Sequence, residues 1–201
     1  MIRVLLADDE NLIRSALATM LSLEDDIEIV GQAESGEDAV TAAKEHSPDV
    51  AVLDLQMGGI DGIEAAGLIK EALPSCAAII VTSHGRPGYL KKALSAGVRG
   101  FLPKTTSAST LAEVVRTVNG GGRYVDPTLA AEAIGAGDSP LTPREADVLE
   151  FASDGATIAE IAQRAHLTQG TTRNYLSSAA AKLGAANRHE ASAVARRHGW
   201  I

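Results

Sequence analysis

The chain has 201 residues, of which 45% are hydrophobic, 22% charged and only 3% aromatic. This length accommodates one large or two modest domains, with cores built mainly from Ala, Val, Leu and Ile. A single cysteine, Cys76, excludes an intramolecular disulfide and fits a reducing compartment. No apolar run approaches the ~18–20 residues needed to span a bilayer, and the N-terminus is unlike a signal peptide. We therefore expect a cytoplasmic protein with no stable membrane association.

The net charge of −8 is unevenly distributed along the chain. Residues 1–138 hold 11 basic and 20 acidic residues, a formal charge of −9, whereas residues 139–201 hold 7 basic and 6 acidic residues, a charge of +1. Between residues 164 and 188 the charged side chains are all basic: Arg164, Arg173, Lys182 and Arg188. An acidic first half joined to a locally basic second half leaves nucleic-acid binding open for the second half.

The first 120 residues alternate between short apolar runs and longer amphipathic stretches. We expect strands at Ile2–Ala7, Ile27–Ala33, Val50–Leu53, Ala78–Thr82 and Gly100–Leu102, and helices at about 12–23, 36–46, 61–73, 87–96 and 107–119. Near-continuous apolar strands separated by helices indicate a parallel sheet covered on both faces. The predicted fold is therefore α/β, a doubly wound five-stranded parallel sheet over residues 1–120.

A different pattern follows residue 120. Residues 121–139 are rich in Gly, Pro and Ala and are typical of a linker, with one short helix near 127–134. From residue 140 to 201 the pattern is helical, with segments at 142–153, 157–165, 168–182 and 187–198. Thr142 and Thr157 are N-cap candidates for the first two. The sequence predicts a second, smaller all-α domain.

Several polar residues fall where predicted strands of the sheet end. Asp8 and Asp9 follow the first strand, Asp54 the third, Thr82 ends the fourth, and Lys104 follows the fifth. Ligands of doubly wound sheets bind beyond the carboxyl ends of the strands, so these groups are expected to share one crevice. Crowded carboxylates favour a cation such as Mg²⁺, and one of them could then attack a phosphoryl group.

Each of these residues also has an ordinary interpretation. An Asp-Asp pair commonly starts a solvated loop, Thr82 could simply end its strand, and Lys104 could be a surface cation; only their convergence indicates a site. An acidic Mg²⁺ site on such a sheet would also suit a phosphatase that works through an aspartyl phosphate. Repeated turnover of small phosphate esters would separate that enzyme from a switch.

Two short helices joined by a tight turn, at 157–165 and 168–182, form a helix-turn-helix pattern. On the second of these helices Thr171, Arg173, Asn174 and Ser177 can share a polar face while Thr172 and Leu176 pack inward. Arg and Asn suit guanine and adenine edges in the major groove of double-stranded DNA. A small helical bundle with a solvated polar face fits this pattern equally well.

Four segments of the first domain resemble the receiver domain of two-component response regulators: VLLADDE at 4–10, VLDLQM at 52–57, IVTS at 80–83 and GFLPK at 100–104. The resemblance implies a flavodoxin-like receiver that takes a phosphoryl group on Asp54 from a histidine kinase. It further implies Mg²⁺ bound by Asp8, Asp9, Asp54 and the main-chain carbonyl of Gln56, a Thr82/Phe101 switch pair, and a phosphate partner in Lys104. Such a receiver is not an enzyme beyond slow self-dephosphorylation.

Two positions depart from the receiver pattern. Gly58, followed by Gly59, stands where the family usually has Pro, which loosens the loop beside the site. Thr105 stands where Pro in a cis bond is common, and the isomer of the Lys104–Thr105 bond is left open.

In the second domain, LTPRE at 141–145, IAEIA at 158–162, TTRNY at 171–175 and KLG at 182–184 resemble the LuxR/NarL-type DNA-binding domain. The resemblance implies a recognition helix at about 168–182, with base contacts from Arg173, Asn174 and Ser177 and backbone contacts from Thr171 and Lys182. It also implies that 187–198 is a dimerisation helix, whose small Ala191, Ala193 and Ala195 allow close approach.

Residues 85–89 and 198–200 resemble the branch that includes regulators of fatty-acid desaturase genes. Together these features predict a transcription regulator that forms a homodimer on phosphorylation. The alternative is a DNA binder that does not respond to phosphorylation.

Overall fold

The computed structural model describes residues 1–83, 87–135, 139–153, 155–198 and 200–201. It divides into two compact units, the first comprising Met1–Gly85 and Leu90–Pro127 and the second comprising Thr128–Ile201 with Arg86–Tyr89. Gly85, Arg86 and Gly199, which contribute to the resemblance to desaturase-gene regulators, lie outside the described residues. Among the described residues no helix is both long and apolar enough to cross a membrane.

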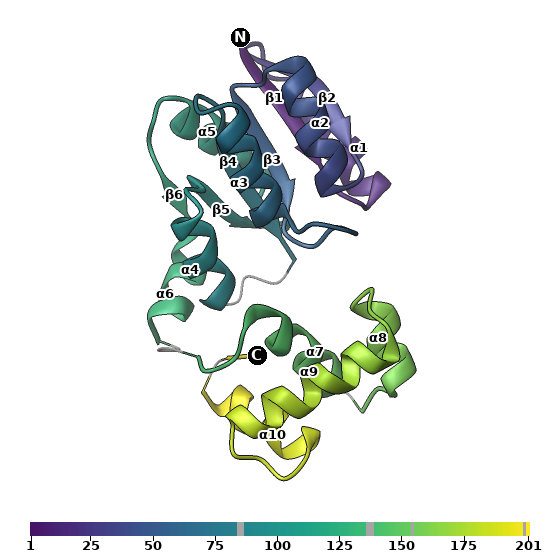
Figure 1. Cartoon of the computed structure of the whole chain (residues 1–201). Helices are drawn as coiled ribbons and strands as arrows, with labels where there is room; N and C mark the ends of the chain where they lie inside the picture. The colour runs from purple at the N-terminus through teal and green to yellow at the C-terminus, as the bar shows by residue number, and fades with distance from the viewer. Residues whose placement is uncertain (84–86, 136–138, 154, 199) are drawn as a thin grey trace. The chain divides into compact units, whose positions relative to one another are not determined.

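The first unit is built on a parallel sheet in the order β2-β1-β3-β4-β5-β6 (Figure 1). The strands are β1 (Ile2–Ala7), β2 (Ile27–Ala33), β3 (Val50–Asp54), β4 (Ala77–Thr82), β5 (Gly100–Pro103) and β6 (Tyr124–Val125). β3 and β4 are buried throughout, as their continuous apolar sequences predict. The doubly wound α/β fold is therefore confirmed, and every strand pair is parallel.

The sixth strand corrects the expected count of five. After α5, Gly121 turns the chain with a φ of +88°, and the backbone N–H of Tyr124 then donates to the carbonyl of Arg99. Asp126 N–H donates likewise to the carbonyl of Phe101. The start of the predicted linker is thus an edge strand of the sheet, too short to show any sequence period.

Five helices connect the strands: α1 (Asn11–Leu21), α2 (Gly36–His46), α3 (Gly62–Ala72), α4 (Pro87–Ser95) and α5 (Ala108–Asn119). Ser35, Asp61 and Ser107 cap α2, α3 and α5 by accepting backbone N–H bonds. A core cluster joins Leu21 of α1 and Val115 of α5 to the sheet, while α2 and α3 pack together. Among these helices, α1, α2, α3 and α5 pack against strands of the sheet.

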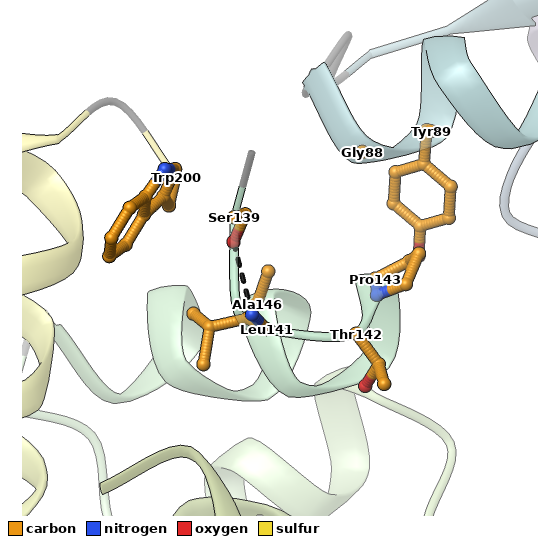
Figure 2. A pocket seen from close by; sticks show the side chains of 8 residues that line it. All are labelled: Gly88, Tyr89, Ser139, Leu141, Thr142, Pro143, Ala146 and Trp200. Atoms are coloured by element: carbon orange, nitrogen blue, oxygen red, sulfur yellow. Dashed lines mark hydrogen bonds between the residues drawn. The ribbon is translucent and has the colours of Figure 1, made fainter. Parts of the chain in front are cut away.

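The second unit contains α6 (Pro127–Gly135, assigned to it from Thr128), α7 (Pro143–Ser153), α8 (Ile158–Arg164), α9 (Gln169–Lys182) and α10 (Arg188–Arg197). Thr142 and Glu145 form a reciprocal capping box at the start of α7, and Thr157 and Glu160 form another at α8. Figure 2 shows the turn before α7, where the N–H of Leu141 donates to Ser139 Oγ at 3.2 Å. The expected all-α architecture is confirmed.

Candidate functional site

The acidic residues at the ends of β1 and β3 converge as expected. One carboxylate oxygen from each of Asp8, Asp9 and Asp54 lies within 4.8 Å of the other two. Asp8 and Asp54 are buried, whereas Asp9 is exposed. Close oxygen donors around one point are the donor set that Mg²⁺ prefers, and the exposure of Asp9 leaves the cluster open to solvent on its side.

Lys104, after β5, is the cation of this cluster. Its Nζ lies 2.9 Å from Asp8 Oδ2, 3.1 Å from Asp54 Oδ2 and 3.0 Å from Glu10 Oε1. The Lys104 side chain is 8% exposed, so its charge acts where solvent screens it weakly. The sequence did not predict the contact with Glu10, although Glu10 directly follows the aspartate pair.

The environment shifts the protonation of both central groups. Burial raises the pKa of Asp54, and the negative charge of Asp8 raises it further. The charge of Lys104 and hydrogen bonds from Lys104 and the backbone N–H of Gln56 lower the pKa, which comes to about 6. Burial disfavours the charge of Lys104, but hydrogen bonds to Asp8 and Glu10 and the charge of Asp54 outweigh it, so its pKa lies above the ordinary value. Lys104 therefore keeps its positive charge, whereas Asp54 takes up a proton more readily than an ordinary aspartate.

Thr82 and Phe101 lie on the neighbouring strands β4 and β5, and the residue opposite Thr82 is Pro103. Thr82 is 1% exposed, and its carbonyl accepts the backbone N–H of Lys104 at 2.8 Å. Phe101 pairs in register with Ile80 and is fully buried. The ring thus already lies inside the fold. The Lys104–Thr105 bond, whose isomer the sequence left open, is trans.

The loop after β3 is held from α2, a contact that the sequence did not predict. Gly59 has a φ of +82°, and a Cβ built on it would lie 2.4 Å from Glu37 Oε1. The same carboxylate oxygen accepts the N–H of Ile60 at 3.2 Å. Gly58, by contrast, has open space where a Cβ would lie. The loop is therefore less loose than its two glycines suggested.

In the second unit α8 and α9 form the expected helix-turn-helix. His166 adopts a φ of +53° in the turn, and the N–H of Leu167 donates to the carbonyl of Ala162 at 2.8 Å. Thr168 caps α9 by accepting the N–H of Thr171. Thr172 and Leu176 of α9 are buried against the core of this unit, as expected from their spacing.

The predicted DNA-contacting residues lie on the outer side of α9. Arg173, Asn174 and Ser177 are exposed, and Thr171 is half-buried. The guanidinium of Arg173 contacts Gln169 of its own helix at 3.4 Å, which leaves it able to reorient. These three exposed side chains form one polar surface that a DNA groove could meet.

The other basic side chains of this stretch are engaged in structural contacts. Lys182 Nζ lies 2.7 Å from Glu145 Oε2, the guanidinium of Arg164 stacks 4.6 Å from the Phe151 ring centroid, and Arg188 donates to the carbonyl of Ala156. The basic stretch seen in the sequence is therefore largely used within the unit.

The structure also corrects the expectation for α10. Ala191 and Ala195 are fully buried in the core of their own unit, so they cannot form a seam with a partner helix. Ala193 is exposed. A helix so short must bury one face against its own unit, which leaves only the opposite face for any partner.

Two family models match this chain. Residues 4–116 match the response regulator receiver domain, and residues 139–195 match the bacterial regulatory proteins of the luxR family. The chain belongs to the response regulators that carry a luxR-type helix-turn-helix, and it is a DNA-binding regulator of transcription.

Individual relatives agree with this class. The chain is 41% identical to the transcriptional regulatory protein DesR of Bacillus subtilis and 38% identical to the uncharacterized transcriptional regulatory protein YvfU of the same organism, each over the whole of both chains. The solved signal receiver domain of the response regulator NarL from Mycobacterium tuberculosis matches 60% of this chain and 97% of its own length, with 32% identity and a TM-score of 0.58. The likeness to DesR bears out the expected branch.

Proposed function

We propose that Asp54 accepts a phosphoryl group from a histidine kinase and that this modification controls DNA binding by the second domain. The observation that carries the proposal is the position of Lys104, 3.1 Å from Asp54 in a pocket shared with Asp8 and Asp9. A phosphorylated Asp54 would keep this cation beside its new negative charge.

In the proposed transfer, a carboxylate oxygen of Asp54 attacks the phosphorus of the kinase phosphohistidine. The new O–P bond forms as the P–N bond breaks, and the imidazole leaves with the electron pair and takes up a proton. Asp8, Asp9, Asp54 and the Gln56 carbonyl would hold Mg²⁺, which when bound supplies positive charge to the phosphoryl oxygens. Thr82 would hydrogen-bond a phosphoryl oxygen. Because Phe101 is already buried, its ring would rearrange inside the fold.

The proposed domains are a receiver over 1–120, a linker over 121–139 and a DNA-binding domain over 140–201. Arg173, Asn174 and Ser177 would meet base edges and Thr171 the phosphate backbone. Lys182, which is paired with Glu145, would add a weaker backbone contact. A homodimer would place two copies of α9 on half-sites about one helical turn apart.

The first test is phosphorylation by acetyl phosphate with Mg²⁺. Asp54→Asn should take up no acid-labile phosphate, while Asp25→Asn, which changes an exposed carboxylate, should label like wild type. Undiminished labelling of Asp54→Asn contradicts the proposal, and steady release of phosphate from many small esters would favour a phosphatase instead.

The second test selects bound fragments from random DNA, with and without beryllofluoride as the phosphoryl mimic. Tighter binding and paired half-sites with the mimic are expected. An identical footprint and dimer affinity in both conditions would favour a regulator that does not respond to phosphorylation.

A further inference from the structure

Arg14 is a buried cation beside the acidic pocket that the phosphotransfer chemistry leaves unexplained. It lies one turn into α1 and is 5% exposed, on the same helix face as Ala18 and Leu21, which pack into the core. A guanidinium on such a face is costly unless its donors are satisfied. Its contacts therefore indicate why it is there.

Those contacts converge on the turn that carries the acidic pair. Arg14 Nη1 donates to the backbone carbonyl of Asp8 at 2.6 Å, and Nη2 donates to Asn11 Oδ1 at 3.0 Å and to Glu34 Oε1 at 2.7 Å. Glu34 follows β2 and its side chain is 74% exposed. The guanidinium thus joins the end of β1, the start of α1 and the end of β2.

The carbonyl of Asp8 belongs to the peptide unit that joins Asp8 to Asp9. Other contacts fix the rest of Asp8: its N–H donates to the carbonyl of Ala33, its Oδ1 accepts the N–H of Glu10 at 2.8 Å, and its Oδ2 pairs with Lys104. Asp9 is exposed and lacks such restraints on its side chain among the described residues. By holding this peptide plane, Arg14 therefore helps set the backbone position from which the Asp9 side chain extends.

We propose that Arg14 is a positioning residue that fixes the Asp8–Asp9 peptide and so presets the divalent-cation site before the metal arrives. This inference rests on the proposed function, because it assumes that Asp8, Asp9 and Asp54 bind Mg²⁺. Without Arg14, the turn must become ordered when Mg²⁺ binds, so the affinity for Mg²⁺ falls. Groups behind metal ligands commonly change affinity about tenfold or more when removed.

The test compares Arg14→Met and Arg14→Lys with wild type in the full chain, by calorimetric titration with MgCl₂ and by hydrogen exchange in metal-free buffer. Arg14→Met should bind Mg²⁺ about tenfold more weakly, and the amides of Asp9 and Glu10 should exchange faster. Arg14→Lys keeps the charge but lacks the fork that reaches both Asp8 and Glu34, so it should fall between the two. Glu34→Gln is the matched control: it keeps an acceptor for Arg14 and should bind Mg²⁺ like wild type.

Wild-type affinity and exchange in folded Arg14→Met overturn the inference and leave the proposed function intact. If Arg14→Met does not fold, Arg14→Lys decides, and wild-type Mg²⁺ affinity in that variant overturns the inference. If wild type itself binds no Mg²⁺, the proposed function fails and this inference with it.

Discussion

The carboxylate of Glu145 links helices α7 and α9 of the second unit. It lies at the start of α7, is 4% exposed, and accepts hydrogen bonds from Lys182 Nζ at 2.7 Å and Ser178 Oγ at 2.6 Å, both on α9. It also accepts the backbone N–H of Thr142 at 2.7 Å. Glu145 therefore caps α7 and fixes α9, the helix proposed to read DNA, with one side chain.

Glu145→Gln should destabilise the protein by about 1–3 kcal/mol, because the amide cannot serve so many donors. Burial raises the pKa of Glu145, but bonds from Lys182, Ser178 and Thr142 outweigh it and lower the pKa to about 2. A lowered carboxyl pKa stabilises the fold above its ordinary value of 4.5, and that stability is lost as the pH falls toward 2. Chemical denaturation at pH 7 and pH 3 measures this; a variant equally destabilised at both pH values contradicts it.

Arg173 and Lys182 should differ in how they contribute to DNA binding. On a duplex selected with the wild-type chain, Arg173→Gln should cost about 1–3 kcal/mol and relax sequence preference. The Lys182 ammonium is already paired with Glu145. Lys182→Gln should therefore change the slope of log affinity against log salt concentration by less than ~0.9, the change expected when one full phosphate contact is lost. Fluorescence anisotropy across a salt series measures both. A change of ~0.9 in this slope for Lys182→Gln would show that the Lys182 ammonium leaves Glu145 to contact a DNA phosphate.

Much of this arrangement could be read from the sequence because it depends on position along the chain. β1 and β2 lie where their apolar runs predicted, and the ends of parallel strands brought Asp8, Asp54 and Lys104 together without any knowledge of contacts. β6 was not predicted, because two residues are too few to show the alternating pattern of a strand.

Contacts between distant elements were not readable in the same way. Glu145 looked like a helix cap, and nothing local shows that Lys182, 37 positions later, reaches it. Arg14 did leave a signal, since a cation stands on the face of α1 that Ala18 and Leu21 bury. A buried charge on an otherwise apolar helix face indicates that partners from other elements satisfy it.

Asp54 should make the metal-free protein less stable as the pH rises. Its folded pKa of about 6 lies above the ordinary 3.8, so the folded state binds more protons than the unfolded chain between these values, and stability decreases across that window. Asp54→Asn should flatten this dependence and add about 1–3 kcal/mol at pH 7. Urea denaturation in EDTA from pH 4 to 8 checks it; Glu28→Gln, at an exposed position, is the control. A parallel loss of stability in wild type and Asp54→Asn would assign the dependence to another group.

The same protonation should limit phosphorylation. The attacking carboxylate must be ionised, so labelling by acetyl phosphate at low Mg²⁺ should rise with pH through about 6. Cations bound by the cluster favour the ionised form, and saturating Mg²⁺ should move the midpoint to lower pH. Initial labelling rates at two Mg²⁺ concentrations test this. A midpoint that stays fixed as Mg²⁺ rises would mean that the ion does not act on Asp54.

Gly58 and Gly59 should respond oppositely to alanine. Gly58 lacks a positive φ and has open space for a Cβ, so Gly58→Ala should stabilise by about 0.4–1 kcal/mol through the unfolded chain. Gly59→Ala must hold a φ of +82° and displace the Glu37 carboxylate that accepts the Ile60 N–H, so it should destabilise by about 1–2 kcal/mol. Thermal unfolding ranks the two against wild type. Glu37→Ala in the Gly59→Ala background separates the causes, because removing the carboxylate relieves the clash but not the backbone strain. If the double variant regains nothing, the φ requirement alone explains why glycine stands at position 59, beside the acidic pocket.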